Sequence, residues 1–404
     1  MRISGQLSRF QKNRGGCDII NPMEKERADY FLLGVVGTII LLGVLVLSGV
    51  SAPLALENFG STSSYLFHQL LFGFLPGIIL GVTVFLLPVK LMKKLALPLF
   101  LLTILSLLFV FHPIAGVISG GAARWLTVGP ISFQPSEFLK LTFILYIAAW
   151  LAGRHKEQVS ARSSLRRAPS ADTSSLSRFI VFLAITVFLS ALLISQPDMS
   201  TLGIIVATGT IMYFVARVPI RYLIVLGALS VPALFLLVKY EPYRFKRIMV
   251  FLNPSIEPMG IGYQLKQALI TIGSGGLAGI GAGMNSKQLQ FLPAVMSDAI
   301  FAAFAQELGF VGSFLLIALF VLFAWRGISI AKNSGDVFYQ LVAVGITFWI
   351  ALQAFVNMGA MSGILPIAGV PLPFLSYGGS HVIAELIGVG ILLNISRRSG
   401  ARIS

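Results

Sequence analysis

The chain is a series of long apolar stretches separated by short polar segments. A hydrocarbon core about 30 Å thick requires roughly 20 apolar residues per helix, and ten stretches approach that length. They lie near residues 30–50, 66–87, 95–111, 135–152, 179–194, 200–216, 222–238, 300–324, 338–361 and 378–395. This pattern predicts an all-α, polytopic membrane protein with about ten transmembrane helices, which form a single domain over residues 30–400.

The basic residues predict how these helices are oriented. Cytoplasmic loops collect Lys and Arg, and with residues 1–29 inside, the inner segments hold 22 basic residues and the outer segments 7. We therefore expect both termini to be cytoplasmic. Residues 1–29 are polar and basic, and we expect a disordered tail there. The first apolar stretch is long for a signal peptide, so we interpret it as a retained anchor. Met1 and Met23 both stay open as the start.

Composition excludes two other classes of protein. Only 11% of the residues are charged and 56% are apolar, whereas soluble domains carry about 25% charged residues. The net charge of +15 first suggests a nucleic-acid binder. A nucleic-acid interface gathers its basic residues in one patch, but here they fall between the apolar stretches. The single cysteine, Cys17, excludes an intramolecular disulfide.

Two polar segments are longer than the others. Residues 153–178 are rich in Ser, Arg and Ala, and we expect a mobile cytoplasmic loop. Residues 239–299 form the predicted outer segment between the seventh and eighth helices, and they contain eight glycines between positions 260 and 283. Six basic residues there run against the charge bias: Lys239, Arg244, Lys246, Arg247, Lys266 and Lys287. Long loops in compact proteins are usually functional, so this large extracytoplasmic loop is a candidate site.

Acidic residues at the membrane are costly and are therefore candidates for function. Five lie within or beside the predicted spans, and all but the last lie near outer ends: Glu137, Asp198, Asp298, Glu307 and Glu385. Asp298 precedes an apolar helix, so it is either a helix cap or a general base. Glu307 lies nine positions later, on the opposite side of a helix, so the two cannot form an acid pair on one face.

Other spacings leave two interpretations open. Glu137 and Lys140 share a helix face, where they either neutralise each other or, with Arg124 and Gln134, bind an anionic head group. Asp198 is predicted to cap a helix. The glycines of 273–283 either allow close helix packing or line a substrate. They do not indicate a dinucleotide site, because no strand–helix unit accompanies them. The four histidines are scattered and suggest no zinc site.

Several motifs, in this order, resemble the SEDS family (shape, elongation, division and sporulation) of peptidoglycan polymerases over roughly residues 30–400. They are GAARW (121–125), QPSE (134–137) with Lys140, QPD (196–198), YR (243–244) with Arg247, FLNP (251–254), GYQ (262–264), IGSGG (272–276), FLP (291–293), Asp298, ELG (307–309) and PLPFLSYGGS (371–380). GYQ and SKQ (286–288) are more similar to the division-type branch, FtsW, than to the elongation-type branch, RodA.

The resemblance implies polymerisation of lipid II, a disaccharide pentapeptide on undecaprenyl diphosphate, at the outer face of the bacterial cytoplasmic membrane. It implies that Asp298 is the catalytic general base of an inverting transfer. The departing diphosphate needs cations, and Mg²⁺ or Mn²⁺ could assist them. Expected partners are a class B penicillin-binding protein and other membrane proteins of cell division, but no nucleic acid. The residues expected to bind substrate are Arg124, Glu137, Lys140, Arg244, Arg247, Gln264, Lys287, Glu307 and Ser376.

The chain departs from the family pattern at a few positions, which are Ala294, Ala299, Gln306, His381 and Glu385. These changes either tune the substrate or mark reduced activity. Two other functions would suit the same features. A lipid II flippase would also use many helices and acidic groups, and a catalytically weak scaffold of the division machinery would keep the fold.

Overall fold

The protein is described by a computed structural model that covers residues 28–112, 116–119, 122–128, 131–163, 171–216, 218–240, 242–253, 259–281, 283 and 291–400. Most of the predicted tail (1–29) and Lys287 lie outside the described residues.

Helices dominate the described chain. They are α1 (Tyr30–Phe59), α2 (Ser64–Gln69), the π-helical turn η1 (Leu70–Phe74), α3 (Leu75–Leu86), α4 (Val89–Phe109), α5 (Pro135–Ser163), α6 (Ala171–Ser195), α7 (Met199–Val215), α8 (Ile220–Tyr240), α9 (Pro242–Leu252), α10 (Ile261–Ser274), α12 (Ile300–Asn333), α13 (Val337–Met361) and α14 (Gly379–Gly400).

Eight helical segments among the described residues are long and apolar enough to cross a membrane, with α2, η1 and α3 forming one of them. The shorter apolar helices α7 and α8 occupy two further predicted stretches. The prediction of an all-α, polytopic membrane protein is therefore confirmed.

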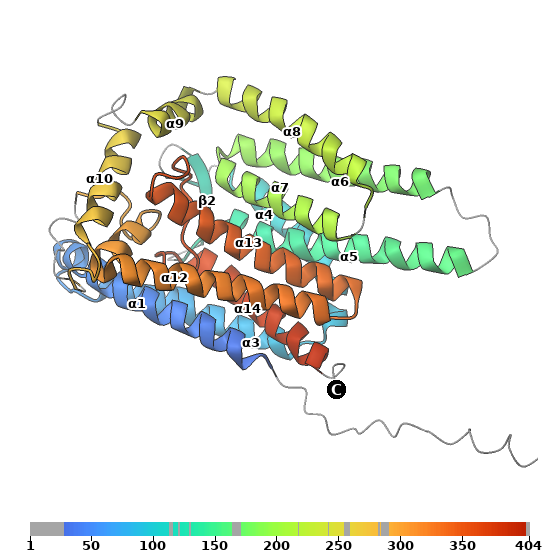
Figure 1. Ribbon diagram of the computed structural model, residues 1–404, viewed down its shortest axis with the longest axis horizontal. Helices are drawn as coiled ribbons and strands as arrows, with labels where there is room; N and C mark the ends of the chain where they lie inside the picture. The colour runs from blue at the N-terminus through green and yellow to red at the C-terminus, as the bar shows by residue number, and fades with distance from the viewer. Residues whose placement is uncertain are drawn as a thin grey trace, which may run out of the picture.

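The helices run side by side, with α5, α13 and α14 at the centre of the bundle (Figure 1). About 72%, 67% and 78% of their apolar windows are buried, against 28% for α4 and 33% for α6. A helix that is apolar all round is buried in protein or faces lipid. The outer helices therefore present their apolar side chains to lipid, and polar groups on the three central helices are enclosed by protein.

A three-stranded antiparallel sheet lies between α4 and α5, which the apolar pattern did not predict. It consists of β1 (Gly116–Ser119), β2 (Ala122–Val128) and β3 (Ile131–Phe133), in that order. Leu126 of β2 pairs with Gly116 of β1 and with Phe133 of β3. Strands of three to seven residues carry too few alternations to be recognised beside long apolar stretches. The sheet leads directly into α5 and carries Arg124.

The two long segments predicted as loops are partly helical. Residues 239–299 contain α9 and α10, and the predicted loop 153–178 is shortened because α5 continues to Ser163 and α6 begins at Ala171. A search for long apolar stretches misses amphipathic helices such as α9, because basic residues interrupt the apolar ones along its sequence.

The glycine-rich segment after α10 packs closely on a kink in α12. Gly309 interrupts α12 with φ 68° and ψ −166°, a conformation that favours glycine. The backbone amides of Ile280 and Gly281 donate to the carbonyl oxygens of Gln306 and Glu307 at 3.1 Å each. A side chain at Gly279 would collide with the carbonyl group of Glu307. These contacts support the close-packing interpretation of the glycines.

Candidate functional site

Asp298 lies just before α12, where the sequence allowed a capping role. The N-cap of α12 is Ala299, however, and no side chain caps this helix end. The capping interpretation of Asp298 is therefore wrong. The half-buried Asp298 carboxylate serves no cap, which leaves it available for chemistry.

Three hydrogen bonds hold the carbonyl oxygens of residues 296–298, and a fourth ties the same Asn357 side chain to Val370. Asn357 of α13 donates its side-chain amide to the carbonyl oxygens of Asp298 at 2.7 Å and Val370 at 2.6 Å. The Ser376 hydroxyl donates to the Ser297 carbonyl oxygen at 2.6 Å, and the Tyr377 amide donates to that of Met296 at 2.7 Å. The position of Asp298 is thus set by α13 and by residues 370–377, which precede α14.

Arg247 lies beside the Asp298 carboxylate, across Gly369. A Cβ atom built on Gly369 would lie 3.5 Å from Asp298 Oδ2 and 3.7 Å from Arg247 Nη2. Gly369 also has a φ of 65°, so two constraints favour glycine there. Arg247 Nη1 donates to the carbonyl oxygen of Ile367 at 3.0 Å, which fixes the guanidinium in place.

Burial raises the pKa of the Asp298 carboxyl above its ordinary value of 3.8, and the positive charges of Arg247 and Arg124 oppose that rise. A carboxyl group whose pKa is raised by desolvation is a stronger base than an ordinary aspartate. This electrostatic setting suits a residue that must accept a proton near neutral pH.

Arg124 of β2 contacts the QPD motif that precedes α7. Its guanidinium donates to the carbonyl oxygen of Gln196 at 3.0 Å and to that of Pro197. Asp198 caps α7, since its carboxylate accepts from the Thr201 amide at 3.2 Å. The capping prediction for Asp198 is therefore confirmed, and the two carbonyl groups before it position Arg124.

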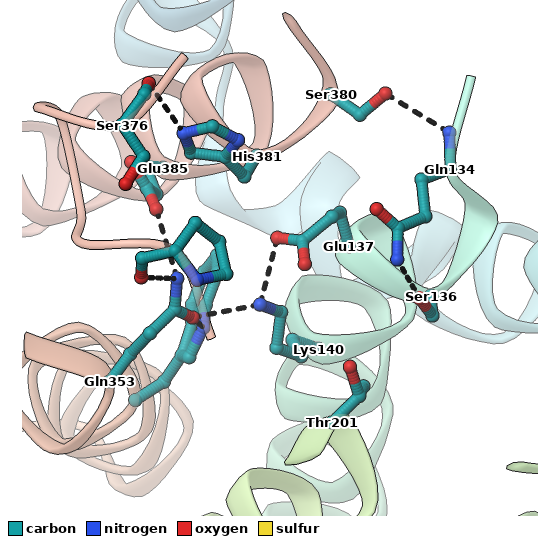
Figure 2. Close-up of polar contacts among 12 residues, drawn as sticks. Gln134, Ser136, Glu137, Lys140, Thr201, Gln353, Ser376, Ser380, His381 and Glu385 are labelled. Carbon is teal, nitrogen blue, oxygen red and sulfur yellow. Dashed lines mark hydrogen bonds and ion pairs between the residues drawn. The ribbon is translucent and has the colours of Figure 1, made fainter. Parts of the chain in front are cut away.

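Glu137 and Lys140 form an ion pair at 2.8 Å inside the bundle, with side-chain exposures of 5% and 2% (Figure 2). The pairing predicted from their spacing is confirmed. Lys140 Nζ also donates to Gln353 Oε1 at 2.8 Å. Gln353 and Asn357 of α13 were not singled out from the sequence. Two amides four residues apart on one face of an apolar span are a signal that could have found them.

Glu307 packs against α1 and the glycine-rich segment after α10. It is buried, and its Oε1 accepts from the backbone amide of Gly283 at 3.0 Å. A side chain at Gly49 of α1 would meet the same oxygen at 2.7 Å. These contacts favour a structural role in fastening α1 and the glycine-rich segment to α12, rather than the substrate contact that the resemblance implied.

The remaining candidates are spread over several elements. Ser376 is buried and fastens Ser297, as described above. Arg244 on α9 and Gln264 on α10 are half-buried. Lys287 lies outside the described residues.

A cavity of about 350 Å³ is lined in part by residues 292–297, which directly precede Asp298. Its lining is mostly apolar and consists of Leu54, Leu292, Pro293, Ala294, Val295, Met296, Ser297 and Tyr377. Within the described ranges, no group of three or more His, Cys, Asp or Glu side chains could hold a metal ion.

The fold and the site together define a polytopic membrane protein with an aspartate carboxylate beside an arginine at one end of its bundle. The family described as cell cycle protein, which covers FtsW, RodA and SpoVE, matches residues 30–400. The chain belongs to this family, and the predicted SEDS membership is confirmed.

Named relatives and solved structures agree with this assignment. The chain is 39% identical to stage V sporulation protein E of Bacillus subtilis over 72% of this chain and 76% of that protein. It is 33% identical to the probable peptidoglycan glycosyltransferase FtsW of Trichlorobacter lovleyi over 93% and 94% of the two chains. A structure described as coordinating polymerization and crosslinking in a peptidoglycan synthase complex has a TM-score of 0.74 at 27% identity and covers 92% of this chain and 98% of that one. The rod shape determining protein RodA of Thermus thermophilus has a TM-score of 0.64 at 26% identity, with 92% and 97% covered.

Proposed function

We propose that this protein is a peptidoglycan glycosyltransferase that polymerises lipid II into glycan strands during cell division, with Asp298 as general base. The observation that carries this proposal is the Asp298 carboxylate, which caps no helix, lies beside Arg247 and directly follows Ser297, a residue that lines a cavity. Relatives that match over nine tenths of this chain are named probable peptidoglycan glycosyltransferases.

The proposed step is a single inverting displacement. Asp298 accepts the proton of an acceptor sugar hydroxyl, and the hydroxyl oxygen forms a bond to the anomeric carbon of the growing strand. The bond from that carbon to the lipid diphosphate breaks, and the electron pair leaves on the diphosphate. Arg247 and Arg124 stabilise the negative charge of the leaving group as it develops. The proton remains on Asp298 until water removes it.

Among the described residues, no group of three or more His, Cys, Asp or Glu side chains forms a dedicated metal site. The step above is therefore written with the chain's own residues alone. Assaying polymerisation with and without Mg²⁺ or Mn²⁺ tests the expected divalent cation directly.

The orientation follows from the basic residues. Lys90, Lys93 and Lys94 begin α4, and Arg397 and Arg398 end α14, at the opposite end of the bundle from Asp298. Placing these lysines and arginines in the cytoplasm puts Asp298 at the outer face of the bacterial cytoplasmic membrane. A class B penicillin-binding protein is the proposed partner, which would crosslink the glycan strands, together with other membrane proteins of cell division.

The test uses the full chain, purified with and without a class B penicillin-binding protein and supplied with labelled lipid II. We expect glycan polymer from the parent and none from Asp298→Asn. The matched control is Asp336→Asn. Asp336 caps α13 at the opposite end of the bundle by accepting from the Phe338 amide at 2.8 Å, and asparagine also caps helices. This control should polymerise like the parent.

Two outcomes would overturn the proposal. Lipid II transfer across vesicles without polymer, unchanged in Asp298→Asn, would identify a flippase. A folded protein that neither polymerises nor transports, even with its partner, would identify a scaffold.

A further inference from the structure

The first two turns of α14 hold three other segments of the chain through buried side chains (Figure 2). The Ser380 hydroxyl accepts from the Gln134 amide at 3.0 Å, at the junction of β3 and α5. His381 Nε2 lies 3.1 Å from the Ser376 carbonyl oxygen, and because a carbonyl oxygen only accepts, this nitrogen is the donor. Glu385 follows one turn later and is 0% exposed.

Both oxygens of the Glu385 carboxylate accept hydrogen bonds from different elements. Oε2 accepts from the Phe374 amide at 2.9 Å, in the segment that precedes α14. Oε1 accepts from Gln353 Nε2 of α13 at 3.3 Å. A carboxylate is well suited to this position, because each of its oxygens can accept while a glutamine offers one oxygen only.

Gln353 connects Glu385 to Lys140. Gln353 Nε2 donates to Glu385 and to the Pro371 carbonyl oxygen, the latter at 3.1 Å. Gln353 Oε1 accepts from Lys140 Nζ at 2.8 Å and from Trp349 Nε1 at 2.9 Å. The partners on each side leave one possible orientation for this amide, with its oxygen toward Lys140 and its nitrogen toward Glu385.

Glu385 also connects, through Phe374, to the segment that holds Asp298. Phe374 has a φ of 65°, a backbone conformation that residues with side chains rarely adopt and that the surroundings must maintain. Two residues later, Ser376 fastens the carbonyl oxygen of Ser297, and Tyr377 fastens that of Met296. A continuous path therefore runs from Lys140 to the backbone next to Asp298. It consists of hydrogen bonds through Gln353 and Glu385 and of the backbone of residues 374–377.

We propose that Glu385 is a positioning residue that holds Asp298 in register with Lys140, by fixing Gln353 and the Phe374 backbone at the same time. This inference rests on the proposed function of Asp298. It adds a fully buried residue whose hydrogen bonds go to Gln353 and Phe374 and which affects the rate of the reaction through them.

The test compares Glu385→Gln with the parent in lipid II polymerisation by the full chain and its partner. Glutamine keeps the size of the side chain but turns an NH₂ group toward one of the two donors, so one hydrogen bond is lost. We expect kcat to fall about tenfold, while KM for lipid II stays within about twofold, because a misplaced base slows the chemical step more than binding.

The matched control is Asn394→Ala, at the other end of the same helix. Asn394 is also 0% exposed, and its amide donates to the carbonyl oxygens of Val84 and Leu87 at 2.8 and 2.7 Å. Its loss should lower the midpoint of thermal unfolding and leave kcat of the folded protein unchanged. An equal fall of kcat in Asn394→Ala and Glu385→Gln would reduce Glu385 to a packing role and overturn the inference.

A milder variant covers the case in which Glu385→Gln fails to fold. Ser376→Ala breaks the path at its last step before Ser297 and leaves Glu385 intact. It should lower kcat in the same way. Combining the two changes, where both fold, should cost less than the product of the single effects, because they interrupt one path. A kcat within twofold of the parent for Ser376→Ala would overturn the inference.

A second measurement separates this inference from the proposed function. Ser297→Cys, in a Cys17→Ser background, places a thiol on the half-exposed segment next to Asp298. Its labelling by a maleimide should be about threefold faster when Glu385→Gln is present. Faster labelling in a chain that makes no polymer would support the positioning role of Glu385 and reject the polymerase function. Unchanged labelling in a chain that makes polymer would support the polymerase function and reject the positioning role.

Discussion

Two ion pairs lie at opposite ends of the bundle. Each joins a carboxylate to a cation, but their surroundings differ, so we expect different effects when each pair is broken. Glu137 and Lys140 pair at 2.8 Å with both side chains at most 5% exposed. Asp29 and Arg326 pair at 2.5 Å, with the arginine side chain 36% exposed. Both pairs join a carboxylate to a cation, but only the first is closed off by protein on both sides.

Their further contacts lead to different parts of the molecule. Lys140 donates to Gln353, and Gln353 donates to Glu385, which lies on the path toward Asp298. Asp29 caps α1 by accepting from the Leu32 amide at 3.0 Å, and its own amide donates to the Ser396 hydroxyl at 3.2 Å. The contacts of the first pair therefore lead toward the segment that holds Asp298, whereas the second pair fastens the beginning of α1 to α12 and α14.

The largest effect is expected at the end of the bundle that holds Asp298. Asp298→Asn removes the proposed general base, and general-base catalysis contributes about 10²–10⁴ in rate, so polymerisation should fall at least about 100-fold while thermal unfolding changes little. Gel separation of labelled glycan strands measures the activity. Residual polymer above about a tenth of the parent level would show that another group accepts the proton.

Breaking the enclosed pair should cost the most stability. Lys140→Met leaves the Glu137 carboxylate buried without its cation, which costs about 3–5 kcal/mol in comparable cases. Adding Glu137→Gln should restore much of that loss, because no uncompensated charge remains. Denaturant unfolding in detergent measures both variants. Equal stability of Lys140→Met and the double variant would show that Glu137 is compensated by something other than Lys140.

Removing the arginine beside Asp298 should change the pH dependence of the reaction. Arg247 holds the pKa of Asp298 down against the effect of burial, so Arg247→Gln raises that pKa further. The base is active above its pKa, and the acid limb of a plot of kcat/KM against pH should therefore move to higher pH. At the parent's optimum kcat/KM should fall roughly tenfold, the usual size for a lost charged contact. An acid limb that stays in place would show that Arg247 does not act on Asp298.

The smallest effect is expected at the pair whose arginine is partly exposed. Arg326→Gln removes a cation that is 36% exposed from a carboxylate that is 4% exposed, and because water can reach this site, the loss should be smaller than the roughly 3–5 kcal/mol of a fully enclosed pair. Asp29 keeps its capping bond to Leu32, so α1 should still begin at Tyr30. Unfolding should shift slightly and polymerisation should match the parent. A loss of stability as large as that of Lys140→Met would abolish the contrast between the two ends.

Features that depend on neighbours along the chain were predictable. All ten apolar stretches are helical, and eight of the helical segments among the described residues are long and apolar enough to cross a membrane. The cap at Asp198 and the pairing of Glu137 with Lys140 are confirmed, because helix length, capping and i,i+3 contacts are local properties of a helix. The same local logic was wrong for Asp298, since α12 begins one residue later with Ala299 as its N-cap. It also missed the sheet around Arg124 and the helices α9 and α10.

That this is a membrane protein with many helices can be concluded from the sequence, because the length of an apolar stretch is a local property and is the main requirement for crossing lipid. The residues that lie beside Asp298 depend instead on how the helices pack in three dimensions. Asn357, Gly369 and Arg247 are distant from it along the chain and meet it through packing. Inside lipid-facing helices a buried polar group must find its partner within the protein, and folding alone selects which partner that is.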